Sequence, residues 1–317
     1  MTITLQQIEE AHQRIAPYIH RTPVVTNRTI NKIVGADLHF KCENFQKIGA
    51  FKIRGGINAT LTLSTEKLKN GIATHSSGNH AQAIAYAAKI VGTKAYIVMP
   101  NNSPSVKVNA VKDYGAEITF CEPNQAARKG TLQAIIDATG AEFIHPYDDY
   151  RVITGQATCA KELIEDAGPF DIIVAPVGGG GLFSGTCLST HYLLPNTLIY
   201  AGEPEGAADA ILSIKTGKVE QALYVDTIAD GLLTTLSDKT LSIIQQYVKE
   251  ILLVSEDEIK AALRLVYERM KIVVEPSCVV PLAAILKNKE KFAGKKVGII
   301  LTGGNVDLSK FGEWFKD

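Results

Sequence analysis

A lysine beside an aromatic residue lies in a glycine-flanked segment, Gly49-Ala50-Phe51-Lys52-Ile53-Arg54-Gly55-Gly56. Most lysines are solvated side chains on helix surfaces, which is the simpler interpretation. A Schiff-base lysine is the alternative, because such an amine must be neutral to attack a carbonyl. Burial and a neighbouring cation such as Arg54 both favour the neutral amine. The segment alone leaves both interpretations open.

A polar segment, Ser76-Ser77-Gly78-Asn79-His80, follows the predicted strand Ile72–Thr74 and opens a predicted helix at Ala81. Backbone N–H groups at the start of a helix are unpaired and carry positive partial charge, so they can bind a carboxylate. An ordinary helix N-cap uses the same residue types. The segment is therefore a candidate anion site, with a structural cap as the second interpretation.

Two further segments with adjacent glycines follow predicted strands. Gly178-Gly179-Gly180-Gly181 lie between the apolar strand Asp171–Ala175 and a helix, where they can form a nest of N–H donors for a phosphate. This position disfavours a flexible linker. Thr302-Gly303-Gly304-Asn305 follow the strand Lys296–Leu301, and ligands of open α/β sheets bind at the carboxyl ends of strands.

The run of four glycines has a competing interpretation. Gly179-x-Gly181-x-x-Ser184 is similar to a dinucleotide-binding fingerprint, and Glu203 ends the next strand where a ribose-binding acid would lie. On these residues alone, a nicotinamide cofactor and another phosphate-bearing ligand both remain open.

Composition narrows the class of protein. The 317 residues are 46% hydrophobic and 21% charged, which favours a large buried core over disorder. Equal numbers of basic and acidic residues, 33 each, provide no excess of positive charge for a nucleic-acid surface. The five cysteines are scattered, as in a reducing compartment, and neither a secretory signal nor an apolar run of about 20 residues is present. We expect a cytoplasmic protein without nucleic-acid or membrane partners.

Short β-branched runs alternate with longer amphipathic ones, which predicts an α/β fold with largely parallel sheets. The capping pair Thr4 and Gln7 predicts an N-terminal helix, and Ser255 with Glu258 predicts a later one. The alternation is clearest in residues 71–148, where four strands are predicted: Ile72–Thr74, Ala95–Met99, Glu117–Phe120 and Glu142–Ile144. We expect residues 1–70 and 149–317 to form a large domain and 71–148 a small four-stranded one, with a ligand cleft between them.

In this order and spacing, the four segments resemble the fold-type II pyridoxal-phosphate enzymes, in particular the serine/threonine dehydratase and serine racemase family. The resemblance covers almost the whole chain and includes further short motifs: Arg21-Thr22-Pro23, Lys41-Cys42-Glu43-Asn44, His145-Pro146, Gly155-Gln156 and Glu275-Pro276. It implies a tryptophan-synthase-β-like fold of two interleaved open twisted sheets. It disfavours the nicotinamide cofactor, which would leave Lys52 and Ser76–His80 without a role.

The resemblance also implies residue roles. The implied binding residues for pyridoxal 5′-phosphate are Phe51, Lys52, Asn79, Gly178, Gly179, Gly180, Gly181 and Thr302. Those for the substrate carboxylate are Ser76, Ser77, Gly78, Asn79 and His80. Lys52 would carry the cofactor, and Ser77 would lie on the opposite face of the cofactor ring. The glycine run would bind the phosphate, Asn79 the phenolic oxygen and Thr302 the pyridine nitrogen.

The implied contact of Thr302 indicates a reaction type. A neutral hydroxyl cannot keep the pyridine nitrogen protonated as a carboxylate would, so the ring withdraws electrons less strongly. This suits β-elimination and disfavours transamination. We therefore expect Lys52 to remove the Cα proton of L-serine, L-threonine or both, giving a 2-oxo acid and ammonia.

Other activities remain compatible with the sequence. Reprotonation of Cα by Ser77 would allow racemisation, so a serine racemase with side dehydratase activity is one alternative. A 3-hydroxyaspartate dehydratase is another. A non-catalytic binding protein of the same fold is the third, but the intact set of Lys52, Ser77, Asn79 and Thr302 argues against it.

The resemblance further implies a divalent-cation site formed by Glu203, the Ala207 carbonyl and Asp209. Hard oxygen ligands fit magnesium, or else calcium or manganese, whereas a solvated acidic turn is the alternative.

Ala157 replaces a common family glycine, which could narrow the space near the cleft. The family implies a homo-oligomer, with a dimer favoured. We expect no C-terminal regulatory domain after Thr302–Asn305, and a nucleotide effector at a subunit interface remains compatible.

Overall fold

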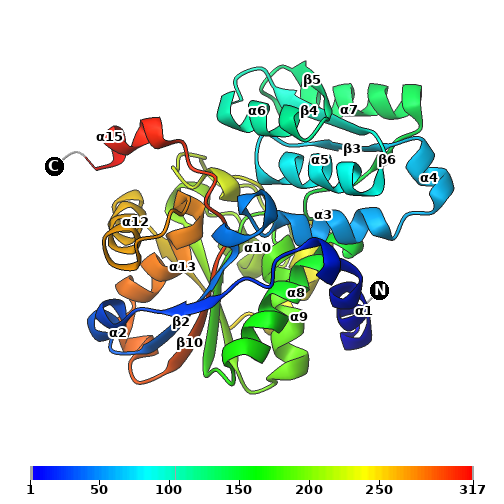
Figure 1. Cartoon of the computed structure of the whole chain (residues 1–317). Helices are drawn as coiled ribbons and strands as arrows, with labels where there is room; N and C mark the ends of the chain where they lie inside the picture. The colour runs from blue at the N-terminus through cyan, green and yellow to red at the C-terminus, as the bar shows by residue number, and fades with distance from the viewer. Residues whose placement is uncertain (1–2, 104, 316–317) are drawn as a thin grey trace.

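The computed structural model describes residues 3–103 and 105–315 and contains two β-sheets flanked by helices (Figure 1). The six-stranded sheet has the order β1-β2-β10-β7-β8-β9, in which β1 pairs antiparallel with β2 and the other neighbours pair parallel. The four-stranded parallel sheet has the order β5-β4-β3-β6. The strands are β1 (Val24–Thr26), β2 (Asp37–Cys42), β3 (Ile72–His75), β4 (Ala95–Pro100), β5 (Glu117–Cys121), β6 (Glu142–Phe143), β7 (Ile172–Pro176), β8 (Leu198–Pro204), β9 (Glu250–Val254) and β10 (Lys296–Leu301). The predicted α/β fold with two open sheets is confirmed.

Helices cover both faces of the large sheet. The α-helices are α1 (Leu5–Ile15), α2 (Arg28–Val34), α3 (Lys52–Leu61), α4 (Thr65–Lys69), α5 (Asn79–Val91), α6 (Ser105–Asp113), α7 (Gln125–Thr139), α8 (Tyr150–Ala167), α9 (Gly181–Leu193), α10 (Ala210–Thr216), α11 (Asp238–Tyr247), α12 (Glu256–Met270), α13 (Pro276–Lys287), α14 (Lys289–Phe292) and α15 (Phe311–Trp314). Both predicted capping boxes are present, at the starts of α1 and α12. Among the described residues, none of the helices has the length and apolar character needed to cross a membrane.

Alternating side chains of the large sheet pack into two separate apolar layers. Ile172 and Val174 of β7 face a core shared with α2, α12 and α13. Ile173 and Ala175 of the same strand face a second core shared with α8, α9 and α11. Figure 1 shows α2, α12 and α13 on one side of the sheet and α8 and α9 on the other. Burial on both faces explains why β7 is an uninterrupted apolar run in the sequence.

The carboxyl ends of three strands position the segments that could do chemistry. Ser76–His80 follow β3, the four glycines follow β7 and Thr302–Asn305 follow β10. Lys52 is the first residue of α3, which packs against α5 and α8 and so connects the two sheets. The topology therefore directs all four segments to one region between the sheets.

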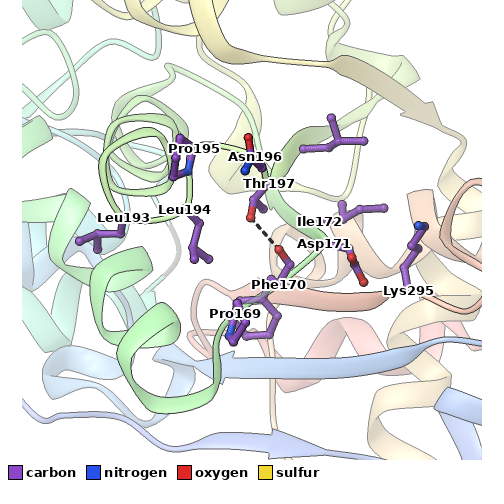
Figure 2. Close-up of a pocket in the computed structure, with 11 residues that line it drawn as sticks. Pro169, Phe170, Asp171, Ile172, Leu193, Leu194, Pro195, Asn196, Thr197 and Lys295 are labelled. Atoms are coloured by element: carbon purple, nitrogen blue, oxygen red, sulfur yellow. Dashed lines mark hydrogen bonds between the residues drawn. The ribbon is translucent and has the colours of Figure 1, made fainter.

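A cavity of about 410 Å³ lies at the amino ends of the strands of the large sheet, opposite to the segments described above (Figure 2). Its lining includes Asp171 and Leu198 at the amino ends of β7 and β8, and Lys295 just before β10. Thr197 Oγ1 donates to the Phe170 carbonyl oxygen at 2.6 Å across this cavity. The cavity is therefore separate from the segments that follow the carboxyl ends of the strands.

Candidate active site

The four glycines form a loop whose shape excludes side chains. Gly180 has φ of +84°, a left-handed conformation that glycine adopts without strain, and it caps the start of α9. A Cβ atom added to Gly179 would lie 2.3 Å from the ring of Tyr147. One added to Gly180 would lie 2.8 Å from Thr240 Cβ. Because the loop precedes the first turn of α9, its N–H groups have the arrangement that binds a phosphate at a helix start.

Lys52 lies at the amino end of α3 with its amine held in place. Its Nζ donates to the carbonyl oxygen of Pro146 at 3.0 Å and lies 5.2 Å from the centre of the Phe51 ring. Burial lowers the pKa of Lys52 to about 8, although the negative charge of Glu275 opposes this shift. A substantial fraction of the amine is therefore neutral near pH 8, as attack on a carbonyl requires.

Arg54 does not contribute to this shift, contrary to the expectation from the sequence. Its guanidinium is fully buried and lies 2.7 Å from carboxylate oxygens of both Glu43 and Glu162. Two carboxylates compensate its charge, so burial rather than a neighbouring cation lowers the pKa of Lys52. Arg54 instead joins α3 to α8 through Glu162.

The turn after β10 holds the lysine segment directly. The Phe51 N–H donates to the Thr302 carbonyl oxygen at 3.0 Å, and Ala50 forms an antiparallel bridge with Gly303. Thr302 is only 3% exposed. The structure thus brings together Lys52 and Thr302, which are 250 positions apart in the sequence.

Asn79 is held by Glu275, the residue before α13, and by Asn305, in the turn after β10. Its Nδ2 donates to both carboxylate oxygens of Glu275, at 2.9 and 3.2 Å. The Asn305 Nδ2 donates to Asn79 Oδ1 at 2.8 Å. Gly78 precedes Asn79 as the N-cap of α5, and its N–H donates to Ser76 Oγ at 3.2 Å. The start of α5, with its unpaired N–H groups, is therefore anchored beside the turn that follows β10.

The other two residues of the predicted carboxylate site differ in their surroundings. Ser77 is half-buried in the loop between β3 and α5. His80 is buried, and its Nε2 lies 3.0 Å from the Ile144 carbonyl oxygen, while Nδ1 has no hydrogen-bond partner. Burial and the charge of Lys52 lower the pKa of His80 well below its ordinary value. Its side chain is therefore a neutral imidazole directed toward β6 rather than an added cation for the substrate.

Sequence reasoning gave no role to Glu275 or Tyr147. Glu275 is buried, and burial together with the charge of Asp230 raises the pKa of its carboxyl to about 7. Tyr147 packs its ring against the glycine loop. An acid placed before Pro276, inside an apolar stretch, was a signal for Glu275. Tyr147 directly follows the His145-Pro146 motif, but nothing in that motif indicates a contact with the glycine loop.

Ala157 does not line this region. It lies in the apolar core between α8 and α9, where a Cβ on Gly185 would approach the Ala157 nitrogen to 2.6 Å. The expectation that Ala157 narrows the cleft is therefore wrong, because its side chain faces the α8–α9 contact.

The acidic turn after β8 contains two buried carboxyl groups. Glu203 accepts hydrogen bonds from the Ala210 and Ile211 N–H groups at 2.6 and 3.0 Å, and Asp209 accepts one from the Leu236 N–H at 3.2 Å. Burial raises the pKa of Glu203 to about 8 and that of Asp209 to about 7. The described part of the chain contains no cluster of three or more acidic, histidine or cysteine ligands. Burial makes the charged form of both carboxyls costly, and a cation bound beside them would offset that cost. The turn alone, however, does not supply a complete set of metal ligands.

The residues around Lys52 fit pyridoxal phosphate. An amine with a lowered pKa can attach an aldehyde, and the adjacent Phe51 offers a ring face. The glycine loop supplies N–H groups in a space that no Cβ could share. The aldehyde, one ring face and the phosphate of the cofactor therefore each have a matching group in the chain.

Comparison with known proteins agrees with this geometry. Residues 15–303 match the family model described as pyridoxal-phosphate dependent enzyme. The chain is 50% identical to serine racemase of Dictyostelium discoideum, covering 97% of this chain and 96% of that protein. It is 49% identical to beta-hydroxyaspartate dehydratase of Paracoccus denitrificans, covering 97% and 98%.

Solved structures give the same result. The structure of the Dictyostelium discoideum serine racemase superposes with a TM-score of 0.93, covering 97% of this chain and 100% of that one. The T.th. threonine deaminase, 39% identical, superposes with a TM-score of 0.92 over 96% of this chain and 99% of that one. The chain therefore belongs to the family of pyridoxal-phosphate-dependent enzymes.

Proposed function

We propose that the protein catalyses β-elimination of small hydroxy-amino acids, converting L-serine, L-threonine or both to a 2-oxo acid and ammonia. The observation that carries this proposal is the amine of Lys52, which has a pKa of about 8 and donates to the carbonyl oxygen of Pro146, the residue before the Tyr147 that packs on the glycine loop. The structural likeness to threonine deaminase supports an ammonia-lyase. Bound pyridoxal phosphate would supply an aldehyde for the substrate amine and a ring that withdraws electrons from Cα.

The chain's own groups account for the other requirements of the reaction. N–H groups at the start of α5 bind the substrate carboxylate, which orients Cα toward Lys52. Lys52 Nζ, held by the Pro146 carbonyl, takes the Cα proton. The Thr302 hydroxyl supplies a neutral partner for the pyridine nitrogen, which favours rapid loss of the β-hydroxyl over transamination.

Serine racemase and 3-hydroxyaspartate dehydratase are second candidates, favoured by the 50% and 49% identities to relatives with those names. Purified protein is therefore incubated with L-serine, D-serine, L-threonine and the 3-hydroxyaspartate isomers. Oxo acid and enantiomer ratio are followed together. Fastest oxo-acid release from serine or threonine supports the proposal. D-serine formed faster than pyruvate indicates the racemase, and preference for hydroxyaspartate indicates that dehydratase.

Ser77→Ala is expected to abolish racemisation and turnover of D-serine while L-serine elimination is retained. Lys52 would still remove the Cα proton on its own side of the cofactor ring. On the opposite side, no hydroxyl would be left to give a proton to Cα or take one from it. Chiral chromatography of serine and an assay of pyruvate measure the two reactions separately. Ser76→Ala, one residue away, is the control and should preserve their ratio. Equal loss of both reactions in Ser77→Ala would reject the face assignment.

We propose a magnesium site, or one for calcium or manganese, at Glu203, the Ala207 carbonyl and Asp209. Its role is structural or activating rather than chemical, because the turn follows β8, the strand paired with β7, whose end carries the glycine loop. The raised pKa values of both carboxyls support it, since a bound cation would offset the cost of their burial.

Chelation is expected to lower the melting temperature of the wild type, and added magnesium to restore it, because the cation binds only the folded chain. Asp209→Asn should remove this response. Glu205→Gln is the matched control, since Glu205 is in the same turn but exposed and paired with Lys287. A melting temperature insensitive to chelation in the wild type would count against the metal.

We also propose that residues 71–148 form the small domain and that residues 1–70 and 149–317 form the large one. The four-stranded sheet, built from β3 to β6, supports this division.

A cytoplasmic homodimer is proposed as well. All five cysteines are free and buried, which is compatible with a reducing compartment.

A further inference from the structure

An ion pair joins segments that belong to the two sheets. Lys107 lies in α6, which packs against α5 and β5 of the four-stranded sheet, and its Nζ contacts the Asp230 carboxylate. Asp230 begins the short 3₁₀ helix η5 (Asp230–Leu232), between α10 and α11. The Lys107 side chain is 10% exposed and that of Asp230 is 47% exposed. The pair therefore lies at the edge of the protein, with its lysine directed inward.

Each partner borders one of the proposed binding loops. A Cβ added to Gly78 would lie 3.7 Å from Lys107 Nζ, so the amine is beside the start of α5. On the other side, a Cβ added to Gly178 would lie 2.9 Å from Leu232 Cα, so η5 lies directly over the glycine loop. The ion pair thus connects the loop proposed for the substrate carboxylate with the loop proposed for the phosphate.

The segment that carries Asp230 is also attached to the wall of the site. The Gly231 N–H donates to Ser277 Oγ at 2.9 Å, two residues after Glu275. The charge of Asp230 raises the pKa of Glu275 and that of Lys107 lowers it, so both groups lie close enough to act on this buried carboxyl. Glu275 in turn holds Asn79. The pair therefore belongs to the surroundings of the site and is not a remote surface bridge.

We propose that the contact between Lys107 and Asp230 closes the site. When the pair is formed, η5 covers the glycine loop and α6 holds Gly78 beside it. When it breaks, the two loops can separate and ligands can enter or leave. Lys107 and Asp230 are then positioning residues. This inference rests on the proposed function for the assignment of the two loops.

A double-mutant cycle on the holoenzyme tests the contact. Lys107→Met, Asp230→Asn and the double variant are compared with the wild type for the rate at which hydroxylamine releases bound pyridoxal phosphate, followed by absorbance. Each single variant is expected to release the cofactor about tenfold faster and to raise KM for L-serine more than it lowers kcat. The double variant should be no faster than either single one, because the same contact is already lost.

Asp307→Asn is the matched control. The charge of Lys107 also reaches Asp307, but the Asp307 carboxylate accepts hydrogen bonds from the N–H and hydroxyl of Ser309. This variant should release the cofactor at the wild-type rate. Asp230→Glu keeps the charge and should restore slow release, which separates loss of the ion pair from loss of folding. Unchanged release in both single variants, or effects that simply add in the double variant, would overturn the proposal. Release is measured without substrate, so a failure of the proposed lyase activity would not affect this result.

Discussion

Lys52→Ala is expected to lower turnover of L-serine by about a thousandfold or more and to leave the protein without a covalently attached cofactor. The variant loses both the amine that binds the aldehyde and the base that takes the Cα proton, and a positioned base alone contributes about 10²- to 10⁴-fold. Borohydride reduction followed by peptide mass spectrometry should find a pyridoxyl group at position 52 of the wild type and none there in the variant.

The pH dependence of attachment provides a second test of Lys52. Because burial lowers its pKa to about 8, the rate at which the apo wild type binds pyridoxal phosphate should rise with pH to a midpoint near that value. An ordinary lysine would give a midpoint near ~10.4. Lys69→Ala is the control, since Lys69 is 64% exposed on α4 and should leave attachment and turnover unchanged. An adduct at another lysine of the wild type would contradict the assignment.

Gly179→Ala is expected to weaken binding of pyridoxal phosphate by about 10- to 100-fold. The added Cβ would lie 2.3 Å from the Tyr147 ring, so the loop or the ring must move, and such overpacking costs about 1–3 kcal/mol. Fluorescence titration of the apo protein with the cofactor measures the affinity. Far-ultraviolet circular dichroism checks that the fold is retained.

Gly130→Ala is the matched control for the added methyl group. Gly130 lies within α7, and a Cβ there would meet no atom within 4 Å. Alanine favours a helix over glycine, so this variant should be at least as stable as the wild type and bind the cofactor equally well. If Gly179→Ala also binds normally, the glycine loop is not the phosphate site.

The segments of the site were predictable because each has a local cause. Ser76–His80, the four glycines and Thr302–Asn305 each follow an apolar strand, and parallel sheets bind ligands at the carboxyl ends of their strands. The strands themselves were visible because both faces of the large sheet are buried, which requires continuous apolar runs. The role of Lys52 came from the family resemblance that the four segments carry together, since a single lysine has no distinctive pattern.

By itself, then, the sequence determined the two sheets, the capped helices and the four segments, because hydrophobic periodicity and glycine runs act over a few neighbouring residues. Only the tertiary structure decided which groups meet across the chain. It placed Glu275 against Asn79 and Tyr147 over the glycine loop, and it paired Arg54 with two carboxylates. The pKa of Lys52 depends on such long-range packing, since desolvation comes from residues distant in sequence. The physical reason is that strand order and helix packing, which the local pattern does not encode, set the distances between these side chains.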